Sequence, residues 1–584
     1  MADRARSLGA LAAALALAVV AGCGGVPDSG PAGPGREIGD SAPEPLRVAV
    51  LGPRPGAGPD EIVAGFLRAG AASDDDQVVA RSFLTGAAVR AWQPRRGVVV
   101  YPDDSSLEVS VRGTRSPVRV VLTAPVTATI DDQGRYVQAR PGTRAQAVFT
   151  VTRSEGAWRV SVVDADFGSW LPQFGLDRTY SARPVSFVAA GTTTLVPDLR
   201  WLPGPRPSRA TALVRQLLLG PPGYLGSAVV TGFPPGTTLA VDAVPTTDGV
   251  ASVDLSRQAL TATPAMRQMM WAQLTATLRR LPSVADVQLT VAGAPFQVPG
   301  VTTTSVYADT AFRDDVRVTG TPVVLSRDRL VRVEPAGRLT SPAGQGLPRA
   351  AGLRSVSVGS LGSLVVGVDV DGHRLVRLQT QGPATVLLTG SSLIDPVVDL
   401  NGAIWSADLG RPGQVRVVSS TAVQSAASPV AAVVLAAPWL TGRTVRSLDV
   451  SRDGARVVLV SADAEGVRRV DVAGVVRAAD GAPLALAQPL EVARSLNEVT
   501  DAAWADLTDL AVLGRGAGDR TARPYDVVVG GPATALAPVA GAVTIAAGDG
   551  VRALYVTTSG GQVLARSGTG WAVVGAGRSV SVPQ

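Results

Sequence analysis

The fold is indicated most clearly by one stretch of the chain, Ser447-Leu448-Asp449-Val450-Ser451-Arg452-Asp453-Gly454-Ala455-Arg456-Val457-Val458-Leu459-Val460. Its pattern predicts an inner strand, a hairpin turn at Asp453-Gly454 and a second strand. Similar strand starts recur at residues 356–358, 397–400, 502–504 and 544–546. They are spaced by roughly 40 to 55 residues, which is the length of one four-stranded blade of a β-propeller.

Residues 315–584 are therefore expected to form a β-propeller, with further Asp-Gly turns at 371–372 and 549–550. Five blades are visible, and residues 323–333 offer strands for another, so the pattern leaves the blade count open. We expect the ring to close by pairing of a strand near Val323 with the last blade around residues 571–574, because closure hides edge strands. On this hypothesis, loss of residues 575–584 costs little, whereas loss of 560–584 makes the domain aggregate.

Upstream, residues 195–300 show two helical patterns set among strands, which predicts an α+β domain. The first helix, at 208–219, turns Leu213, Leu217 and Leu218 inward and ends at a Gly-Pro-Pro stop. A hairpin follows, with strands at 239–241 and 250–255 around a turn at 247–249, and an alternating strand at 284–291 comes last.

The second helix of this domain opens at Pro264 and has an apolar residue at every fourth position: Met266, Met270, Leu274 and Leu278. We interpret this stripe as core, because methionine is a flexible filler of hydrophobic cores. A cofactor or metal role for the methionines is the less favoured alternative.

Residues 46–185 begin with helices and continue with strands, an order that resembles an α+β fold of the nuclear-transport-factor-2-like (NTF2-like) type. A helix starts at Pro59 with acidic residues near the positive end of its dipole, and its apolar face is formed by Ile62, Val63, Phe66 and Leu67. A second short helix is expected after residues 74–76, with Val79 and Phe83 four positions apart. Trp92 is expected to fill the core, and apolar residues then alternate in two predicted strands, at 107–111 and 158–162.

The N-terminus carries the pattern of a bacterial lipoprotein signal. Arg4 and Arg6 precede an apolar run from Leu8 to Val20, which as a helix spans about 20 Å and is too short for a hydrocarbon core of about 30 Å. The run closes in a lipobox, Val20-Ala21-Gly22-Cys23. We expect residues 1–22 to be a signal peptide and Cys23 to carry a thioether-linked diacylglycerol and an N-acyl chain, rather than to be a small buried hydrophobe. Residues 23–45, rich in Gly, Pro and Ser, are expected to be a flexible tether.

Composition argues against several kinds of chemistry. Cys23 is the only cysteine, so its acylation leaves no thiol for a disulfide, a metal site or a nucleophile. His373 is the only histidine and lies in a turn pattern, which argues against Ser-His-Asp catalysis and most zinc sites. The formal net charge of +6 looks thinly spread, which argues against nucleic acid and is compatible with weak attraction to anionic lipid head groups. No cofactor or metal is expected.

Three pairs of adjacent carboxylates are candidates for general acid or base chemistry: Asp103-Asp104, Asp131-Asp132 and Asp314-Asp315. All three lie beside turn-forming residues. We therefore interpret them as solvated turns.

The order of these parts is similar to that of the actinobacterial lipoprotein LpqB family. The resemblance covers nearly the whole chain and depends on the lipobox, the helix-then-sheet domain, the C-terminal propeller and the segments 217–221, 248–255 and 273–278. These segments make the middle domain resemble a GerMN domain, named from sporulation and germination proteins.

This resemblance implies a lipid-anchored protein on the extracytoplasmic face of the cell membrane, acting as an accessory protein of the MtrA-MtrB two-component system. It would bind the extracytoplasmic domain of the sensor kinase MtrB and tune signals that govern cell-wall homeostasis. The residues themselves indicate an anchored, β-rich binding scaffold without a recognisable catalytic constellation, so no enzyme is expected. Two alternatives stay open: a binder of cell-wall fragments such as muropeptides, and a carboxylate-dependent hydrolase of cell-wall glycans.

Overall fold

The computed structural model describes residues 51–71, 77–204, 206–301, 311–314, 316, 320–334, 339–340, 347–360, 362, 364–420, 423 and 431–583. The chain divides into two compact units, Met1–Arg47 and Val48–Gln584, and the described residues all belong to the second. The predicted signal peptide, lipobox, lipidated Cys23 and tether lie outside the described residues. Within the described chain, no helix is both long and apolar enough to cross a membrane.

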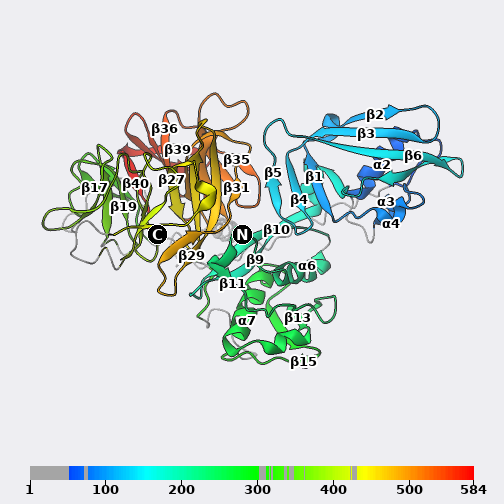
Figure 1. Ribbon diagram of the computed structural model, residues 1–584, viewed down its shortest axis with the longest axis horizontal. Helices are drawn as coiled ribbons and strands as arrows, with labels where there is room; N and C mark the ends of the chain where they lie inside the picture. Colours follow the sequence, from blue (N-terminus) through cyan, green and yellow to red (C-terminus); the bar gives the residue numbers. More distant parts are fainter. Residues whose placement is uncertain are drawn as a thin grey trace, which may run out of the picture. The chain divides into compact units, whose positions relative to one another are not determined.

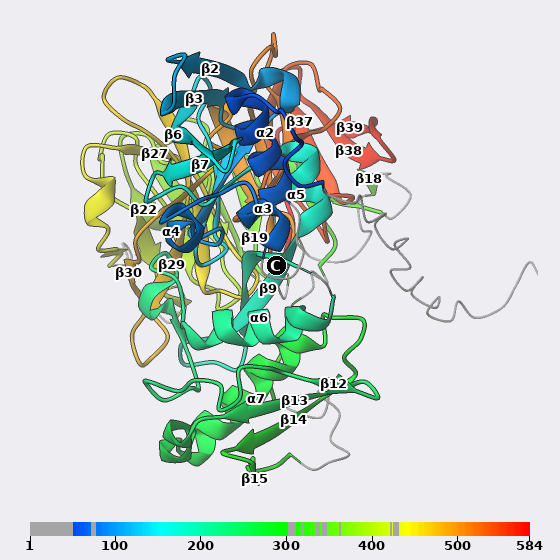
Figure 2. The ribbon, with the colours of Figure 1, turned by 90° about the vertical axis from the view of Figure 1, so that its right-hand side faces the viewer.

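The N-terminal part packs short helices against one of two four-stranded sheets. Helix α2 (Pro59–Gly70) lies across the sheet with strand order β2-β3-β6-β7 (Figure 2), and the other sheet has the order β5-β4-β1-β8 (Figure 1). The remaining elements are α3 (Val78–Arg81), α4 (Ala88–Ala91), β1 (Gly97–Tyr101), β2 (Glu108–Arg112), β3 (Val118–Pro125), β4 (Ala128–Asp131), β5 (Tyr136–Gln138), β6 (Arg144–Ser154), β7 (Ala157–Val163), β8 (Ser169–Pro172) and α5 (Gln173–Thr179). The expected α+β arrangement is confirmed.

The core of this part is the one that the sequence predicts. The apolar face of α2 is buried, with Ile62, Val63, Phe66 and Leu67 all at most 5% exposed. Trp92 fills the core as expected: its ring centroid lies 4.8 Å from that of Phe66, and its Nε1 donates to the Gly168 carbonyl at 2.8 Å. The aromatic contact anchors α2 on the sheet.

Three details of this part differ from the sequence prediction. Helix α3 is a single turn, so buried Phe83 lies beyond its end. The register of β6 and β7 shifts at Thr150, a bulge that reverses the alternation, so Val163 is buried and Val162 is 54% exposed. Valines of β2 lie opposite buried residues of β3 but remain about two-fifths exposed, because β2 is an edge strand.

The middle part contains two sheets and two helices. A long hairpin that the sequence did not predict, β9 (Tyr180–Ala189) and β10 (Leu195–Pro203), forms one sheet with β11 (Val229–Val230). The other sheet has the order β12-β13-β14-β15, with β13 and β14 parallel. The elements are α6 (Arg206–Leu218), η3 (Gly226–Ala228), β12 (Thr246–Thr247), β13 (Val250–Leu255), η4 (Arg257–Thr261), α7 (Pro264–Leu278), β14 (Asp286–Val291) and β15 (Ala294–Pro295).

The predicted helices of the middle part are confirmed, and one predicted strand is wrong. Leu213, Leu217, Met270, Leu274 and Leu278 are fully buried, and Leu218 and Met266 are partly buried against the same cluster, so the methionine stripe packs in the core. The hairpin turn at 247–249 joins β12 to β13. Residues 239–241 form only an isolated bridge, from Leu239 to Leu255, because β12 already occupies the start of the same edge of β13.

Polar side chains of α7 hold strand β9. The Gln273 amide accepts from Gly232 N at 2.7 Å and donates to the Ser186 carbonyl at 3.0 Å, while Thr277 Oγ1 accepts from Ser186 N at 3.1 Å. Both side chains are fully buried, so these bonds satisfy groups that would otherwise destabilise the core.

The described residues of the C-terminal part form a ring of six sheets, a six-bladed β-propeller (Figure 1). Blade 1 has the order β18-β17-β16-β40, and blades 2 to 6 follow in chain order, with β31 added to blade 4. The strands are β16 (Val323–Ser326), β17 (Arg329–Val333), β18 (Leu339–Thr340), β19 (Leu353–Val358), β20 (Val365–Asp369), β21 (Arg374–Leu378), β22 (Thr385–Thr389), β23 (Val397–Val398), β24 (Ile404–Ser406), β25 (Arg416–Val418), β26 (Val433–Val434), β27 (Thr444–Val450), β28 (Arg456–Ala462), β29 (Arg468–Arg477), β30 (Pro483–Leu486), β31 (Leu490–Val492), β32 (Asn497–Trp504), β33 (Asp509–Arg515), β34 (Arg523–Val528), β35 (Ala533–Ala535), β36 (Ala542–Ala547), β37 (Leu554–Thr558), β38 (Gln562–Ser567), β39 (Gly570–Ala576) and β40 (Ser579–Ser581).

The predicted positions of the propeller's inner strands are confirmed. The predicted pairing that closes the ring is wrong in one of its two strands. The five predicted strand starts fall on β19, β23, β27, β32 and β36, and each Asp-Gly pair joins two strands of one blade. A strand near Val323 does close the ring, but its partner is β40, with Val323 opposite Ser581 and Leu325 opposite Ser579. Residues 571–574 belong to β39, the outer strand of blade 6. The segment 575–584, expected to be dispensable, therefore contains the closing strand.

Candidate functional site: ring interior and junction

Serine side chains of the inner strands bond to the backbone of the next blade. Ser579 and Ser581 of β40 accept from the amides of Val356 and Val358 at 3.2 and 2.9 Å, and Ser357 accepts from Val398 N at 3.1 Å. The closing strand is thus fixed both to its own blade and to blade 2.

Two inner-strand carboxylates extend the same pattern around the ring. Asp449 of β27 accepts from Trp504 N at 2.8 Å and Val450 N at 3.0 Å. Asp501 of β32 accepts from Ile545 N at 2.8 Å, from Ala502 N at 2.9 Å and from the Ser447 hydroxyl. Burial raises the pKa of Asp449 to about 7 and that of Asp501 to about 6, and the charge of Asp501 adds to the shift at Asp449.

Perturbed pKa values often mark active sites, so these two inner-strand carboxylates are candidates for catalytic groups. All four of their oxygens, however, accept hydrogen bonds from the protein itself. The arrangement joins blade 4 to blade 5 and blade 5 to blade 6. It favours a structural role over acid or base chemistry.

The carboxylates singled out from the sequence lie at or beside turns where the structure describes them. Asp104 begins a 3-10 turn, Asp104–Ser106, and Asp131 ends β4 just before a turn. Asp103 accepts from the amides of Ser105 and Ser106, and Asp131 accepts from those of Gln133 and Arg135. Asp314 lies 3.6 Å from Arg280, and Asp315 is outside the described residues. His373 lies exposed in the turn between β20 and β21, with Nδ1 3.2 Å from the Gly390 carbonyl oxygen. In the part of the chain that the structure describes, no group of three or more His, Cys, Asp or Glu residues is placed to hold a metal ion.

A buried arginine joins the middle part to the propeller. Arg456 of β28 is 0% exposed and pairs with Asp453, with Nε 3.1 Å from Oδ2. It also donates to the carbonyls of Pro197, on β10, and Leu507 at 3.3 and 2.6 Å, and it lies over the Trp504 ring, 4.6 Å from the centroid. One cation therefore holds a strand of the middle part, a turn of blade 4 and a loop of blade 5.

A second buried ionic group lies on the same hairpin. Asp198 and Arg200 of β10 form an ion pair of 2.6 Å, and Asp198 also accepts from the Tyr224 hydroxyl at 2.9 Å. Arg200 Nη1 donates to the Gln133 carbonyl of the N-terminal part at 3.0 Å. Burial is the main cause that raises the pKa of Asp198, and the positive charge of Arg200 opposes the rise.

Trp201 is the residue at which all three parts meet. Its ring stacks on Tyr136 of β5 with centroids 5.1 Å apart, and its Nε1 donates to the Gly530 carbonyl of blade 5 at 2.9 Å. Nearby, Arg140 of the N-terminal part donates to both carboxylate oxygens of Glu491 at 2.7 Å. No pattern in the sequence pointed to this junction, because its members are far apart in the chain and resemble ordinary strand residues.

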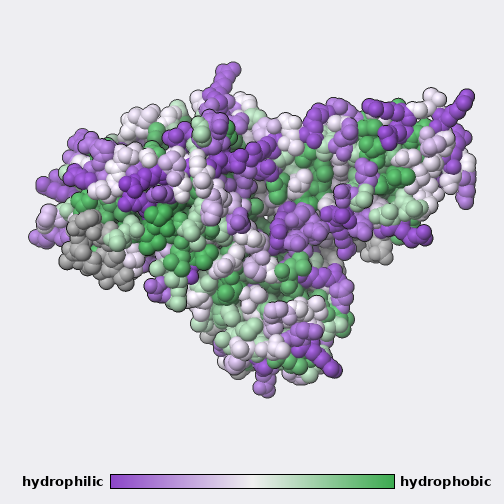
Figure 3. Space-filling view, in the orientation of Figure 1, coloured by the Kyte–Doolittle hydropathy of each residue, from purple (hydrophilic) through white to green (hydrophobic). Residues whose placement is uncertain are grey.

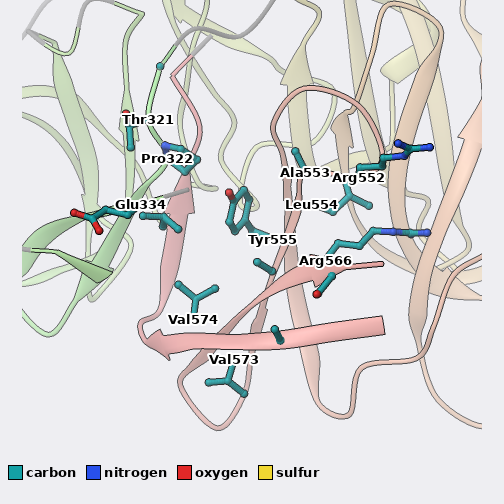
Figure 4. Close-up of a pocket in the computed structure, with 15 residues that line it drawn as sticks. Thr321, Pro322, Glu334, Arg552, Ala553, Leu554, Tyr555, Arg566, Val573 and Val574 are labelled. Carbon is teal, nitrogen blue, oxygen red and sulfur yellow. The ribbon is translucent and has the colours of Figure 1, made fainter. Parts of the chain in front are cut away.

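A cavity of about 550 Å³ lies between blades 1 and 6 (Figure 4). Tyr555, Pro322 and Val574 line it, while the carboxylate of Glu334 and the guanidinium of Arg566 point away in opposite directions. Because these two charged groups diverge, they are not placed to orient one ligand between them.

These features define a multidomain, β-rich protein with a GerMN-like middle domain and a six-bladed propeller. Residues 52–174 match the family model "Lipoprotein LpqB, N-terminal domain", residues 184–297 match "Sporulation and spore germination", and residues 328–584 match "Lipoprotein LpqB beta-propeller domain".

Relatives match over most of the chain. Lipoprotein LpqB of Thermobifida fusca is 30% identical, over 87% of this chain and 88% of its own, and that of Streptomyces coelicolor is 29% identical, over 89% and 88%. The chain belongs to the lipoprotein LpqB family. Among solved structures, the first GerMN domain of the Bacillus subtilis sporulation protein GerM is 20% identical and matches 23% of this chain and 99% of its own, with a TM-score of 0.17.

Proposed function

We propose that this protein is a lipid-anchored accessory protein on the extracytoplasmic face of the cell membrane, which binds the sensor kinase MtrB and tunes MtrA-MtrB signalling. The anchor is supported by the lipobox 20–23, by Cys23 as the sole cysteine and by membership of a family of lipoproteins. The partner is taken from the family resemblance. What the structure itself adds is a body in which the buried polar groups described above join the blades to one another and the middle part to the propeller.

The observation that supports a binding role is that the oxygens of the ring carboxylates Asp449 and Asp501 all accept hydrogen bonds within the protein. A hydrolase needs one free carboxyl group to donate a proton and another to act as base or nucleophile. Asp449 and Asp501 instead accept main-chain amides through every oxygen. A rigid scaffold that presents surfaces to a partner fits this arrangement better than an enzyme does.

The proposed anchor predicts the behaviour of a Cys23→Ser variant. Each methylene of an acyl chain that enters the bilayer contributes about 0.8 kcal/mol, so two or three chains hold a protein firmly. Without the sulfur, we expect an unprocessed precursor or release of the protein from the membrane, measured by cell fractionation and immunoblotting. Mature-sized Cys23→Ser protein that stays in the membrane pellet at normal levels would contradict the anchor.

The proposed partner is tested by a pull-down. The body, residues 46–584, includes the whole compact unit Val48–Gln584 and lacks the acylated cysteine. Immobilised and exposed to detergent-solubilised membranes, it should retain MtrB. The control is the same body heated to unfold it. Retention of other membrane proteins without the kinase would contradict the proposal.

A further inference from the structure

One end of the N-terminal sheet β2-β3-β6-β7 is strongly basic. The turns β2–β3 and β6–β7 lie side by side there, because Val118 pairs with Val151 and the Arg153 amide donates to Ser116 Oγ at 3.0 Å. Five arginines belong to this end, which we call the basic end: Arg112, Arg115, Arg119, Arg153 and Arg159. Within residues 110–120 and 150–162 Glu155 is the one acidic residue, so these segments hold a net +4, against +6 for the whole chain. Positive charge that is dispersed along the sequence is therefore brought together at this end by the fold.

Four of the arginines of the basic end form no ion pair with a described carboxylate. Arg112, Arg115, Arg119 and Arg153 are exposed, and none of them forms an ion pair with a described residue, whereas Arg144, at the opposite end of β6, pairs with Glu108. Arg112 and Arg119 lie directly opposite each other on β2 and β3, a placement of like charges that destabilises a sheet. An anionic partner would relieve this repulsion.

Apolar side chains accompany these charges. Val162 is 54% exposed on the sheet face of Arg119, because both residues lie opposite Thr150, and the half-buried Trp158 lies under Arg153, whose guanidinium carbon is 5.2 Å from the ring centroid. In Figure 3 the right-hand end of this sheet is largely hydrophilic, and hydrophobic residues lie beside it on the side toward the rest of the molecule. Arginine, valine and tryptophan together are typical of surfaces that lie at the boundary of head groups and acyl chains.

The proposed anchor keeps this end within reach of a membrane. The chain advances 28 residues from Cys23 to Leu51, the first described residue, and an extended chain of that length spans at most about 100 Å. Strand β6, with 11 residues, is about 37 Å long. The tether therefore allows the N-terminal sheet to touch the bilayer that holds the acyl chains.

We infer that the basic end docks on the phosphate head groups of an anionic lipid surface, as a second contact beside the acylated cysteine. The inference depends on the proposed membrane anchor, which confines the body and so raises the effective concentration of lipid. Docking would fix the orientation of the body on the membrane. It would do so through charge, so salt should weaken it.

The test uses the unacylated body, residues 46–584, and vesicles. Binding is measured by co-sedimentation with phosphatidylcholine vesicles containing about 30% phosphatidylglycerol, and with phosphatidylcholine alone, at about 50 and 500 mM salt. The variant replaces Arg112, Arg115, Arg119 and Arg153 with Gln. The matched control makes the same change of charge at four exposed arginines elsewhere, Arg257, Arg446, Arg520 and Arg552. Thermal unfolding shows that both variants remain folded.

We expect the body to bind the anionic vesicles at low salt, the basic-end variant to lose at least about tenfold in partition, and the control to lose less than about twofold. Equal losses in the two variants, or no binding by the body at low salt, would overturn the inference. Binding to soluble polyglutamate but not to vesicles would overturn it too, in favour of an acidic protein partner. Because no acyl chain is present, failure here leaves the Cys23 fractionation result unaffected, so the two proposals are judged separately.

Discussion

Deletion of residues 578–584 is expected to open the propeller and make the body aggregate. Strand β40 provides the inner strand of blade 1, and its two serines accept the amides of Val356 and Val358. Each buried amide left without its acceptor costs about 1–3 kcal/mol, and the exposed edges of β16 and β19 become sites for pairing between molecules.

Size-exclusion chromatography and thermal unfolding of residues 46–577 check this expectation, with soluble aggregate or a strongly lowered midpoint as the predicted result. The matched control removes only residues 583–584 and keeps β40, so it should elute and unfold like the intact body. The double variant Ser579→Ala, Ser581→Ala isolates the two hydroxyl groups and should lower the midpoint without aggregation. If the body ending at residue 577 were as soluble and as stable as the control, β40 would not close the ring.

Replacement of Arg456 by Met is expected to lower the free energy of unfolding by about 3–5 kcal/mol, because it leaves the buried carboxylate of Asp453 without its partner. It also removes the donors to the Pro197 and Leu507 carbonyls and the contact with Trp504. The substitution should therefore weaken the contact between the middle part and blades 4 and 5.

Urea unfolding followed by tryptophan fluorescence measures this change, as a midpoint lowered by about 1 M or more. Arg446→Met, at an exposed position of the neighbouring strand β27, is the control and should change stability by no more than about 0.5 kcal/mol. The double variant Arg456→Met, Asp453→Leu removes both charges and should recover part of the loss. A single variant as stable as the control would show that the ion pair does not hold the two parts together.

The parts of this fold that follow local rules could be predicted from the sequence. Asp-Gly pairs between apolar runs located the hairpins of blades 2, 4 and 6, and the four-residue spacing on α7 identified its buried face. The single histidine and most of the paired aspartates were recognised as turn residues. Each of these features depends on residues close together in the chain.

Features that depend on distant residues could not be predicted. Strand β40 is three residues long, Ser-Val-Ser, and carries no run of apolar residues to mark it. The bulge in β7 reverses an alternation that looks regular in the sequence, so Val162 rather than Val163 seemed to face the core. Arg456 follows a turn, where arginine is usually exposed, and it is buried only because residues 197 and 507 fold over it. The basic end arises in the same way, from two hairpins that lie more than 30 residues apart in the chain.

The central claim is that this body binds the sensor kinase directly, and calorimetry with purified domains tests it most directly. Residues 46–584 are titrated into the extracytoplasmic domain of MtrB, with an unrelated sensor-kinase domain as control. Because both proteins would share a membrane, even a modest affinity suffices, and we expect saturable binding at high micromolar concentrations or below with the MtrB domain alone. No binding at those concentrations, together with release of soluble muropeptides from peptidoglycan that is lost in Asp449→Asn or Asp501→Asn, would contradict the account and identify a hydrolase instead.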